Sequence, residues 1–374
     1  MERVALCNLG CKVNAYELDA MKKMLENSGY EIVPFDGIAD IYIVNTCTVT
    51  NIADRKSRQM LHRARKRNPQ AVVVAEGCYI QAGDEACLVA SIDLAIGNNK
   101  KKDLIPILET FLKQRKEGGA DQTLGHTTIP DLRRPVPYEE MTLEGCAGHT
   151  RAFVKIQDGC DQFCSYCVIP LARGRVRSRR PEQVYREAQA LAKSGYQEIV
   201  LTGIHLSSYG MDLVKADGRT GRSREEIRRE TYEQAYLLHL IEDLHEISGL
   251  KRIRLGSLEP RIITDAFARR LQELPKVCPH FHLSLQSGCD TTLKRMNRHY
   301  QAGEYYEKVN LLREVFEDPA ITTDVIVGFP GETAEEFAHT LAFLEKTEFF
   351  EMHVFPYSRR KGTVAAKMPD QVPD

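Results

Sequence analysis

The sequence predicts an α/β protein in which a doubly wound parallel sheet is followed by a partial (β/α)6 barrel of the TIM type. Strand-like and helix-like segments alternate over most of the 374 residues, which is typical of parallel sheets connected by helices. Cysteines follow three successive strands of the first series. A stretch rich in Gly and Pro then separates that series from a second one.

The first series has the pattern of a flavodoxin-like sheet. Asn14 and Glu17 have the spacing of a capping box at the start of a helix that Gly29 ends. Further helices are expected over residues 54–68 and 104–116. Strands are expected over residues 4–9, 40–45, 71–75 and 94–97.

Glycines and prolines over residues 118–149 predict a linker. We therefore expect an N-terminal domain over residues 1–117 and a barrel over residues 150–374. Barrels of this type carry their sites at the carboxyl ends of the strands, and Ser257, Glu259 and Gln286 fall at such positions. The six expected strands are residues 153–156, 198–202, 252–255, 281–285, 323–327 and 352–355.

Composition excludes several classes of protein. Hydrophobic residues make up 43% of the chain and no apolar run is long enough to span a membrane. The amino terminus does not read as a signal peptide. Eleven cysteines without an export signal favour a cytoplasmic protein that binds metal over one with disulfides. The net charge of −1 means that a nucleic-acid partner would need local basic patches.

Three cysteines lie close together in the sequence after the first strand of the second series. Cys160, Cys164 and Cys167 form the pattern C-x-x-x-C-x-x-C. A structural zinc ion takes four protein ligands, whereas a four-iron cluster held by three cysteines keeps one iron open. The missing fourth cysteine therefore favours an open cluster.

A second set of three cysteines is spread over the first series. Cys11, Cys47 and Cys78 each follow an expected strand. Because the carboxyl ends of parallel strands share one edge of a sheet, these residues can meet at one point. A single cysteine at a strand end is usually a core residue; three at equivalent positions, beside Gly10 and Gly77, favour a joint site.

The motifs resemble those of the radical S-adenosylmethionine (SAM) superfamily, and the N-terminal cysteines make the chain similar to its methylthiotransferases. The segments LGCKVN, NTCTVTN and TGIHLSSYG most resemble the branch that acts on N6-threonylcarbamoyladenosine in tRNA. Other matching segments are EGC at 76–78, residues 159–167, RGRVRSR at 173–179, LSLQSG at 283–288, DVIVGFPGET at 324–333 and FPYSR at 355–359.

This resemblance implies two [4Fe–4S] clusters and SAM. Cys160, Cys164 and Cys167 would hold the cluster that cleaves SAM to a 5′-deoxyadenosyl radical, which attacks carbon 2 of the adenine. Cys11, Cys47 and Cys78 would hold the cluster that delivers sulfur. The candidate contacts to SAM are Glu198, Ser257, Glu259 and Gln286; each could instead be an ordinary polar residue at a strand end.

The implied partners are the anticodon stem-loop of tRNA and an electron donor such as flavodoxin or ferredoxin, and we expect a monomer. Two basic stretches follow the cysteines, where they could bind the anionic RNA. From them we single out Arg63, Arg173, Arg175 and Arg177 as candidate RNA contacts. Relatives continue into a tRNA-binding β-barrel after the segment at 368–374, and we expect that module to be absent from this chain.

Other interpretations remain open at this stage. The chain could act on N6-isopentenyladenosine or on a ribosomal-protein aspartate. It could use the N-terminal cluster as an electron relay, with Cys7 or Cys87 as a fourth ligand. It could also be a zinc-stabilised RNA-binding protein without catalysis, in which Cys146 and His149 contribute ligands.

Overall fold

The computed structural model describes residues 1–83, 91–117, 126–143, 150–216, 223, 226 and 235–373. The chain forms two compact units, and each is described by itself. The N-terminal unit comprises residues 1–147 together with 168–175, and the C-terminal unit comprises residues 148–167 together with 176–374. Among the described residues, no helix is long and apolar enough to cross a membrane.

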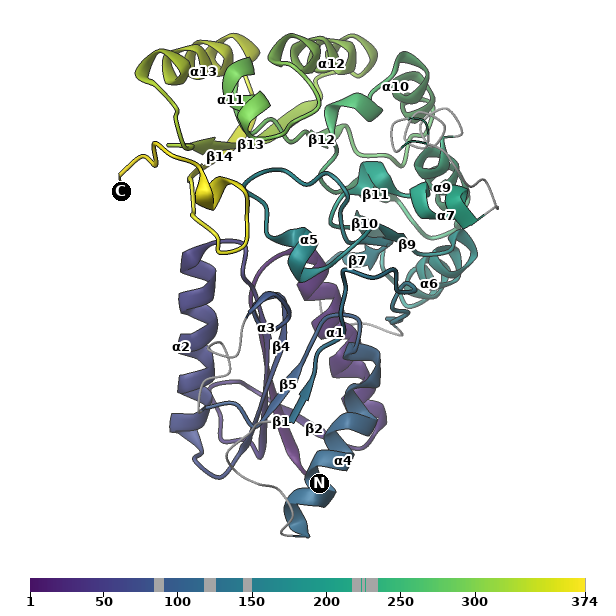
Figure 1. The fold of residues 1–374 in the computed structure, drawn as a ribbon. Coiled ribbons are helices and arrows are strands. Elements are labelled where there is room, and N and C mark those ends of the chain that lie inside the picture. Colours follow the sequence, from purple (N-terminus) through teal and green to yellow (C-terminus); the bar gives the residue numbers. More distant parts are fainter. Residues whose placement is uncertain are drawn as a thin grey trace. The chain divides into compact units, whose positions relative to one another are not determined.

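The N-terminal unit is built on one parallel sheet with helices on both faces (Figure 1). The strand order is β2-β1-β3-β4-β5-β6, which extends the flavodoxin-like order. Its elements are β1 (Arg3–Asn8), α1 (Lys12–Asn27), β2 (Glu31–Val33), β3 (Ile41–Thr46), α2 (Asn51–Arg67), β4 (Val72–Gly77), α3 (Cys78–Ala82), β5 (Leu94–Ile96), the 3₁₀ helix η2 (Lys101–Asp103), α4 (Leu104–Lys116) and β6 (His126–Thr128).

The two central strands explain why this sheet needs helices on both sides. Every residue of β3 and β4 is buried, so both faces of these strands must be covered, as is usual in parallel sheets. Helix α2 covers one face, while α1 and α4 lie on the other (Figure 1). The prediction of a doubly wound sheet is confirmed.

The prediction that Asn14 and Glu17 form a capping box is wrong. Helix α1 begins at Lys12, and its N-cap residue is Cys11, which makes no side-chain cap hydrogen bond. Asn14 and Glu17 are both buried within the helix. Spacing alone suggested a cap, but these two side chains bond to other segments of the unit instead.

Part of the stretch expected to be a linker belongs to the N-terminal sheet. Strand β6 pairs with β5 in parallel, and Leu132, Met141 and Leu143 are buried. The Lys102 backbone N–H donates to the Glu139 carboxylate at 3.0 Å. Residues 126–143 are therefore structured, although their glycines and prolines resemble those of a loop; residues 118–125 lie outside the described part of the chain.

The strands of the C-terminal unit follow the order expected of a partial barrel. They form the parallel sheets β7-β10-β11 and β12-β13-β14, which single parallel bridges such as Leu258 to Leu283 connect. The strands are β7 (Ala152–Lys155), β10 (Glu198–Thr202), β11 (Arg252–Leu255), β12 (His280–His282), β13 (Ala320–Val327) and β14 (Glu351–Pro356), with a small antiparallel pair of β8 (Gln157–Asp158) and β9 (Arg177–Ser178).

Helices follow most of these strands in the sequence, and each helix buries one of its own faces. They are α6 (Pro181–Lys193), α7 (Met211–Ala216), α9 (Tyr236–His245), α10 (Asp265–Gln272), α11 (Asp290–Arg295), α12 (Ala302–Val315) and α13 (Ala334–Thr347), with the 3₁₀ helices η3 (Leu206–Ser208), η4 (Pro260–Ile262) and η5 (Ala365–Lys367). Thr333 and Glu336 form a capping box at the start of α13. The six predicted strands are all present, with ends shifted by up to three residues.

The segment from Val168 to Arg175 packs in the N-terminal unit although it directly follows Cys167. It contains the short helix α5 (Ile169–Ala172). Gly174 has φ 68°, and a Cβ atom there would lie 2.4 Å from the Leu132 carbonyl oxygen. The segment therefore depends on a glycine for its close contact with residue 132.

Gly174→Ala should destabilise the N-terminal unit by more than the strain of a left-handed residue, which is about 1–2 kcal/mol. The matched control is Gly29→Ala, because Gly29 has φ 84° and a Cβ atom there would meet no other atom within 4 Å. Urea unfolding of both variants checks this difference. Equal losses of stability would contradict the packing of residues 168–175 against Leu132.

Candidate active site

The three N-terminal cysteines meet at one edge of the sheet. Cys11 follows β1, Cys47 follows β3 and Cys78 begins α3 directly after β4, and these three strands are neighbours. A Cβ atom on Gly10 would lie 3.1 Å from the Cys47 sulfur, so the loop that carries Cys11 passes close to Cys47. The predicted convergence is therefore present in the fold.

The charges around this site suit a metal centre with thiolate ligands. The pKa of Cys47 is raised to about 11, first by burial and then by the neighbouring Cys78 and Cys11, while Arg173 acts in the opposite direction. Three thiols that oppose one another's ionisation need a positive group to become ligands. Iron supplies such charge, and thiolates are the usual ligands of iron–sulfur clusters. The donor set fits a cluster.

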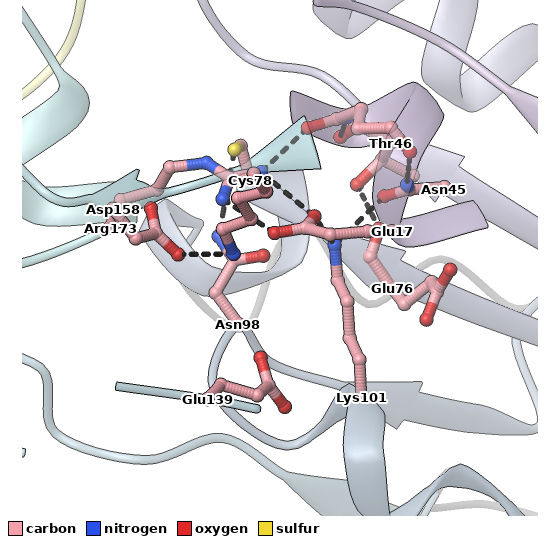
Figure 2. A network of polar contacts seen from close by, with 12 residues as sticks. Glu17, Asn45, Thr46, Glu76, Cys78, Asn98, Lys101, Glu139, Asp158 and Arg173 are labelled. Carbon is pink, nitrogen blue, oxygen red and sulfur yellow. Dashed lines mark hydrogen bonds and ion pairs between the residues drawn. The ribbon is translucent and has the colours of Figure 1, made fainter. Parts of the chain in front are cut away.

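A buried ion-pair network lies beside these cysteines (Figure 2). The Arg173 guanidinium donates to the two Glu17 carboxylate oxygens at 2.8 and 3.0 Å. It also donates to the Asn14 side-chain oxygen at 2.7 Å. The Lys101 ammonium bonds to Glu17 and, at 3.1 Å, to the Asn45 amide oxygen. Glu17, Lys101 and Arg173 are almost completely inaccessible to solvent.

The prediction that Arg173 contacts RNA is therefore wrong. Its side chain is fully buried and belongs to the N-terminal unit. The same segment accepts a hydrogen bond at the Ala172 carbonyl from the Asn98 amide at 2.7 Å, and that amide lies 3.5 Å from the Cys78 sulfur. Arg173 is thus a charged neighbour of the N-terminal cysteines that the sequence motif alone did not reveal.

Glu76 is a second buried group near the cysteines. It lies two residues before Cys78, and neither of its carboxylate oxygens has a hydrogen-bond partner among the described residues. Burial raises the pKa of Glu76 to about 7, with Glu17 and Glu139 adding to the shift and Lys101 opposing it. The neutral form of this carboxyl is therefore favoured over a wider pH range than usual.

The second cysteine set lies in a tight loop after β7 and β8. Gly159 and Phe163 have φ values of 70° and 51°. The Cys167 N–H donates to the Cys164 carbonyl at 2.9 Å, and the Ser165 N–H donates to the Met296 carbonyl at 3.0 Å. The Asn297 amide donates to the Phe163 carbonyl at 2.9 Å. The segment after α11 therefore fixes the shape of the loop.

This loop also has the charge properties of a cluster site. The pKa of Cys160 is raised far above its usual value, first by burial and then by Cys164 and Cys167. The Arg298 guanidinium donates to the Cys164 sulfur at 3.3 Å and lies 4.8 Å from the centre of the Tyr300 ring. Sequence reasoning missed Arg298, because it stands over 130 residues away from Cys164 and outside the cysteine motif.

Three of the four candidate SAM contacts lie at the carboxyl ends of the strands. Glu259 is buried and pairs with Arg261 at 2.5 Å. Burial opposes its ionisation, but His205 and Arg261 outweigh this and hold the pKa of Glu259 below its usual value. Ser257 is exposed after β11, and Gln286 has φ 74° where it bridges to Val325.

Glu198 does not join them. It is the first residue of β10, whereas Cys160 follows the last residues of β7, a parallel neighbour. Its carboxylate pairs with Arg252 at 2.7 Å and with Arg254 at 3.1 Å. Glu198 therefore holds the amino-terminal ends of β10 and β11 together, and its assignment as a SAM contact is wrong.

The remaining candidate RNA contacts differ in exposure. Arg63 is exposed on α2 and pairs with Asp36 at 2.6 Å. Arg175 is half-buried. Arg177 is buried and lies 3.4 Å from the Asp158 carboxylate, so the prediction of an RNA contact there is wrong. Helix α2 carries four exposed basic side chains, those of Arg55, Lys56, Arg63 and Lys66.

Of the further cysteines named in the alternatives, the structure describes Cys7. Cys7 is partly buried and packs against a hydrophobic cluster of the N-terminal unit. Cys87, Cys146 and His149 lie outside the described residues.

Comparison with protein-family models gives two matches. Residues 154–344 match the radical SAM superfamily, and residues 3–97 match a family described as Uncharacterized protein family UPF0004. The two matched regions correspond to the two series of strands. Each of them contains one complete set of three cysteines.

Curated relatives match over the whole chain. The threonylcarbamoyladenosine tRNA methylthiotransferase MtaB of Bacillus subtilis is 40% identical over 100% of this chain and 77% of its own length. The Aquifex aeolicus protein of the same name is 38% identical over 100% of this chain and 84% of its own. The tRNA-2-methylthio-N(6)-dimethylallyladenosine synthase of Caldicellulosiruptor saccharolyticus is 36% identical over 98% of this chain and 73% of its own length.

Among solved structures, the radical SAM methyltransferase TsrM from Kitasatospora setae is similar in fold. It has a TM-score of 0.61 and 17% identity over 97% of this chain and 77% of that chain. This similarity concerns the fold alone.

Arg173→Met should lower the free energy of unfolding by about 3–5 kcal/mol, because it leaves the Glu17 carboxylate buried with one cation fewer. Arg180→Met is the matched control: Arg180 is exposed in the same arginine-rich stretch, and we expect a change within about 0.5 kcal/mol. Urea unfolding measures both. A stable Arg173→Met protein with weakened tRNA binding would contradict the buried role.

Proposed function

The chain belongs to the radical SAM methylthiotransferase family, and we propose that it adds a methylthio group to carbon 2 of N6-threonylcarbamoyladenosine next to the anticodon of tRNA. The observation that carries this proposal is the pair of three-cysteine sites in a chain 40% identical to an enzyme named for that reaction. Each site has three sulfur ligands, which leaves one position of a four-iron cluster open.

The C-terminal site would start the reaction. Cys160, Cys164 and Cys167 would hold a [4Fe–4S] cluster, and the chemistry supplied there with SAM bound is the formation of a 5′-deoxyadenosyl radical that removes hydrogen from carbon 2. Arg298 donates to the Cys164 sulfur, and its positive charge favours the thiolate form of Cys160. Glu259, which is kept ionised, is a candidate for binding a positively charged group of SAM.

The N-terminal site would supply the sulfur. Cys11, Cys47 and Cys78 would hold a second [4Fe–4S] cluster, whose open position can carry the sulfur that becomes the methylthio group. Cys11 is exposed, whereas Cys47 and Cys78 are buried, so the site is reachable from the side of Cys11. Arg173 provides a buried positive charge that favours thiolates at this site.

The finer partner assignments are part of the same proposal. We expect the chain to act as a monomer in the cytoplasm, where tRNA is modified. It would take single electrons from a donor such as flavodoxin or ferredoxin. The exposed basic residues of α2 provide a surface for the RNA backbone in the N-terminal unit.

The substrate is tested by nucleoside mass spectrometry of tRNA from cells with and without the gene. We expect 2-methylthio-N6-threonylcarbamoyladenosine to disappear in the deletion strain. The intact gene should restore it, while Cys47→Ala and Cys164→Ala should not, because each removes one of three cluster ligands. Loss of a methylthio-dimethylallyladenosine instead would assign the chain to the reaction of its 36% identical relative.

The α2 surface is tested by reversing charge. The double variant Arg55→Glu and Lys66→Glu should weaken tRNA binding and reduce the slope of log K against log salt by about one per lost phosphate contact. Lys113→Glu with Lys116→Glu, both exposed on α4, makes the same change in net charge elsewhere in the unit. Equal weakening by both pairs would attribute the effect to net charge and remove α2 as the binding surface.

A further inference from the structure

Two histidines and an aspartate lie on one face of the β12-β13-β14 sheet. His282 pairs in register with Thr322, and Asp324 pairs with His353. Thr322 and Asp324 are two residues apart on β13 and therefore point to the same side. The other face of this sheet is buried: Phe281 is fully inaccessible to solvent and packs on Phe316 with ring centres 4.9 Å apart.

The polar atoms of these three side chains converge. The His282 Nε2 atom lies 3.3 Å from one Asp324 carboxylate oxygen. The His353 Nδ1 atom lies 3.5 Å from the other oxygen. One ligand atom from each residue can be chosen so that all three lie within 4.8 Å of one another. The two histidines approach different Asp324 oxygens, so a zinc ion with bonds of about 2.0–2.2 Å would bind one of these oxygens together with both rings after a small adjustment of the side chains.

The second ring nitrogen of His282 has a partner of the kind found in metal sites. The His282 Nδ1 atom lies 3.0 Å from the Thr322 hydroxyl oxygen, so Nδ1 can donate there and leave the Nε2 lone pair directed at the site. The His353 Nε2 atom lies 3.8 Å from a Glu351 carboxylate oxygen, which is too far for a hydrogen bond. An oxygen partner such as the Thr322 hydroxyl fixes the tautomer and orientation of a histidine that binds metal.

Charge and access also favour a cation. The carboxylates of Asp324 and nearby Glu351 bring negative charge to the two imidazole rings. The side chain of His282 is 15% exposed, that of Asp324 33% and that of His353 51%. An ion could therefore enter from solvent, and three protein ligands would leave a coordination position open.

The geometry points to a site for a divalent transition-metal ion, such as Zn²⁺, held by His282, Asp324 and His353. Two histidines and one carboxylate are a common ligand set for catalytic zinc and for non-haem iron. The site uses none of the six cluster cysteines and goes beyond the proposed function. Its test needs neither tRNA nor SAM, so its failure would leave the methylthiotransferase proposal unaffected.

The test is equilibrium dialysis of the iron-loaded protein against Zn²⁺ under nitrogen, with zinc counted by elemental analysis. Iron loading occupies the cysteines that would otherwise bind zinc. We expect one zinc per chain that is lost in His353→Ala and in Asp324→Ala. His339→Ala is the matched control, because His339 is exposed on α13, and it should keep the zinc. Equal zinc in wild-type and His353→Ala protein would overturn the proposal.

A graded variant separates metal binding from a simple ion pair between His282 and Asp324. Thr322→Val removes only the hydroxyl that orients His282 and should weaken zinc binding about 10- to 100-fold. Zinc anomalous scattering from crystals should show a peak among the three side chains. An anomalous map without a peak there would also overturn the site, whatever the dialysis counts.

Discussion

The ion pair between Arg173 and Glu17 is the interaction on which the arrangement of the N-terminal site depends. Both groups are buried, and burying a charge without a partner costs several kcal/mol. Arg173 therefore requires Glu17 on α1, and Glu17 in turn requires Arg173 and Lys101. Because Arg173 follows Cys167 by only six positions, the segment that leaves the radical SAM loop is fixed in the unit that holds Cys11, Cys47 and Cys78. The segment that follows Cys167 is thus held by a charged contact within the N-terminal unit.

The same interaction affects the chemistry of the cysteines. Three thiolates at one point repel one another, and the raised pKa of Cys47 reflects that repulsion together with burial. The Arg173 guanidinium opposes this rise in pKa, as Arg298 does for Cys160 in the other unit. Each set of cysteines is therefore accompanied by one arginine that stands far from it in the sequence. An anionic cluster is more stable beside such a charge than in an apolar pocket of the same shape.

The sequence predicted those parts of the molecule that local patterns determine. Apolar runs located the strands, and cysteines after β1, β3 and β4 predicted a shared site because parallel strands end at one edge. The errors concern charged side chains whose partners are distant. Arg173 looked like one member of a basic stretch until its partner on α1 was known, and Glu17 had the spacing of a cap. Glu198 was assigned from its motif although it begins the strand predicted over residues 198–202, far from the carboxyl end where this fold carries its sites. Arg298 gave no local signal at all.

The cysteine sites do not by themselves select the substrate. Relatives named for threonylcarbamoyladenosine and for dimethylallyladenosine are 40% and 36% identical to this chain over nearly all of its length. The two modified adenosines differ in the group on N6: one carries a polar amino-acid group and the other a hydrocarbon. A site for the first must offer hydrogen-bond donors or a cation, because a carboxylate buried without them is strongly unfavourable. A site for the second must offer an apolar surface instead. Selection must therefore come from side chains other than the cluster ligands, and the loops at the carboxyl ends of the barrel strands are where this fold presents such residues.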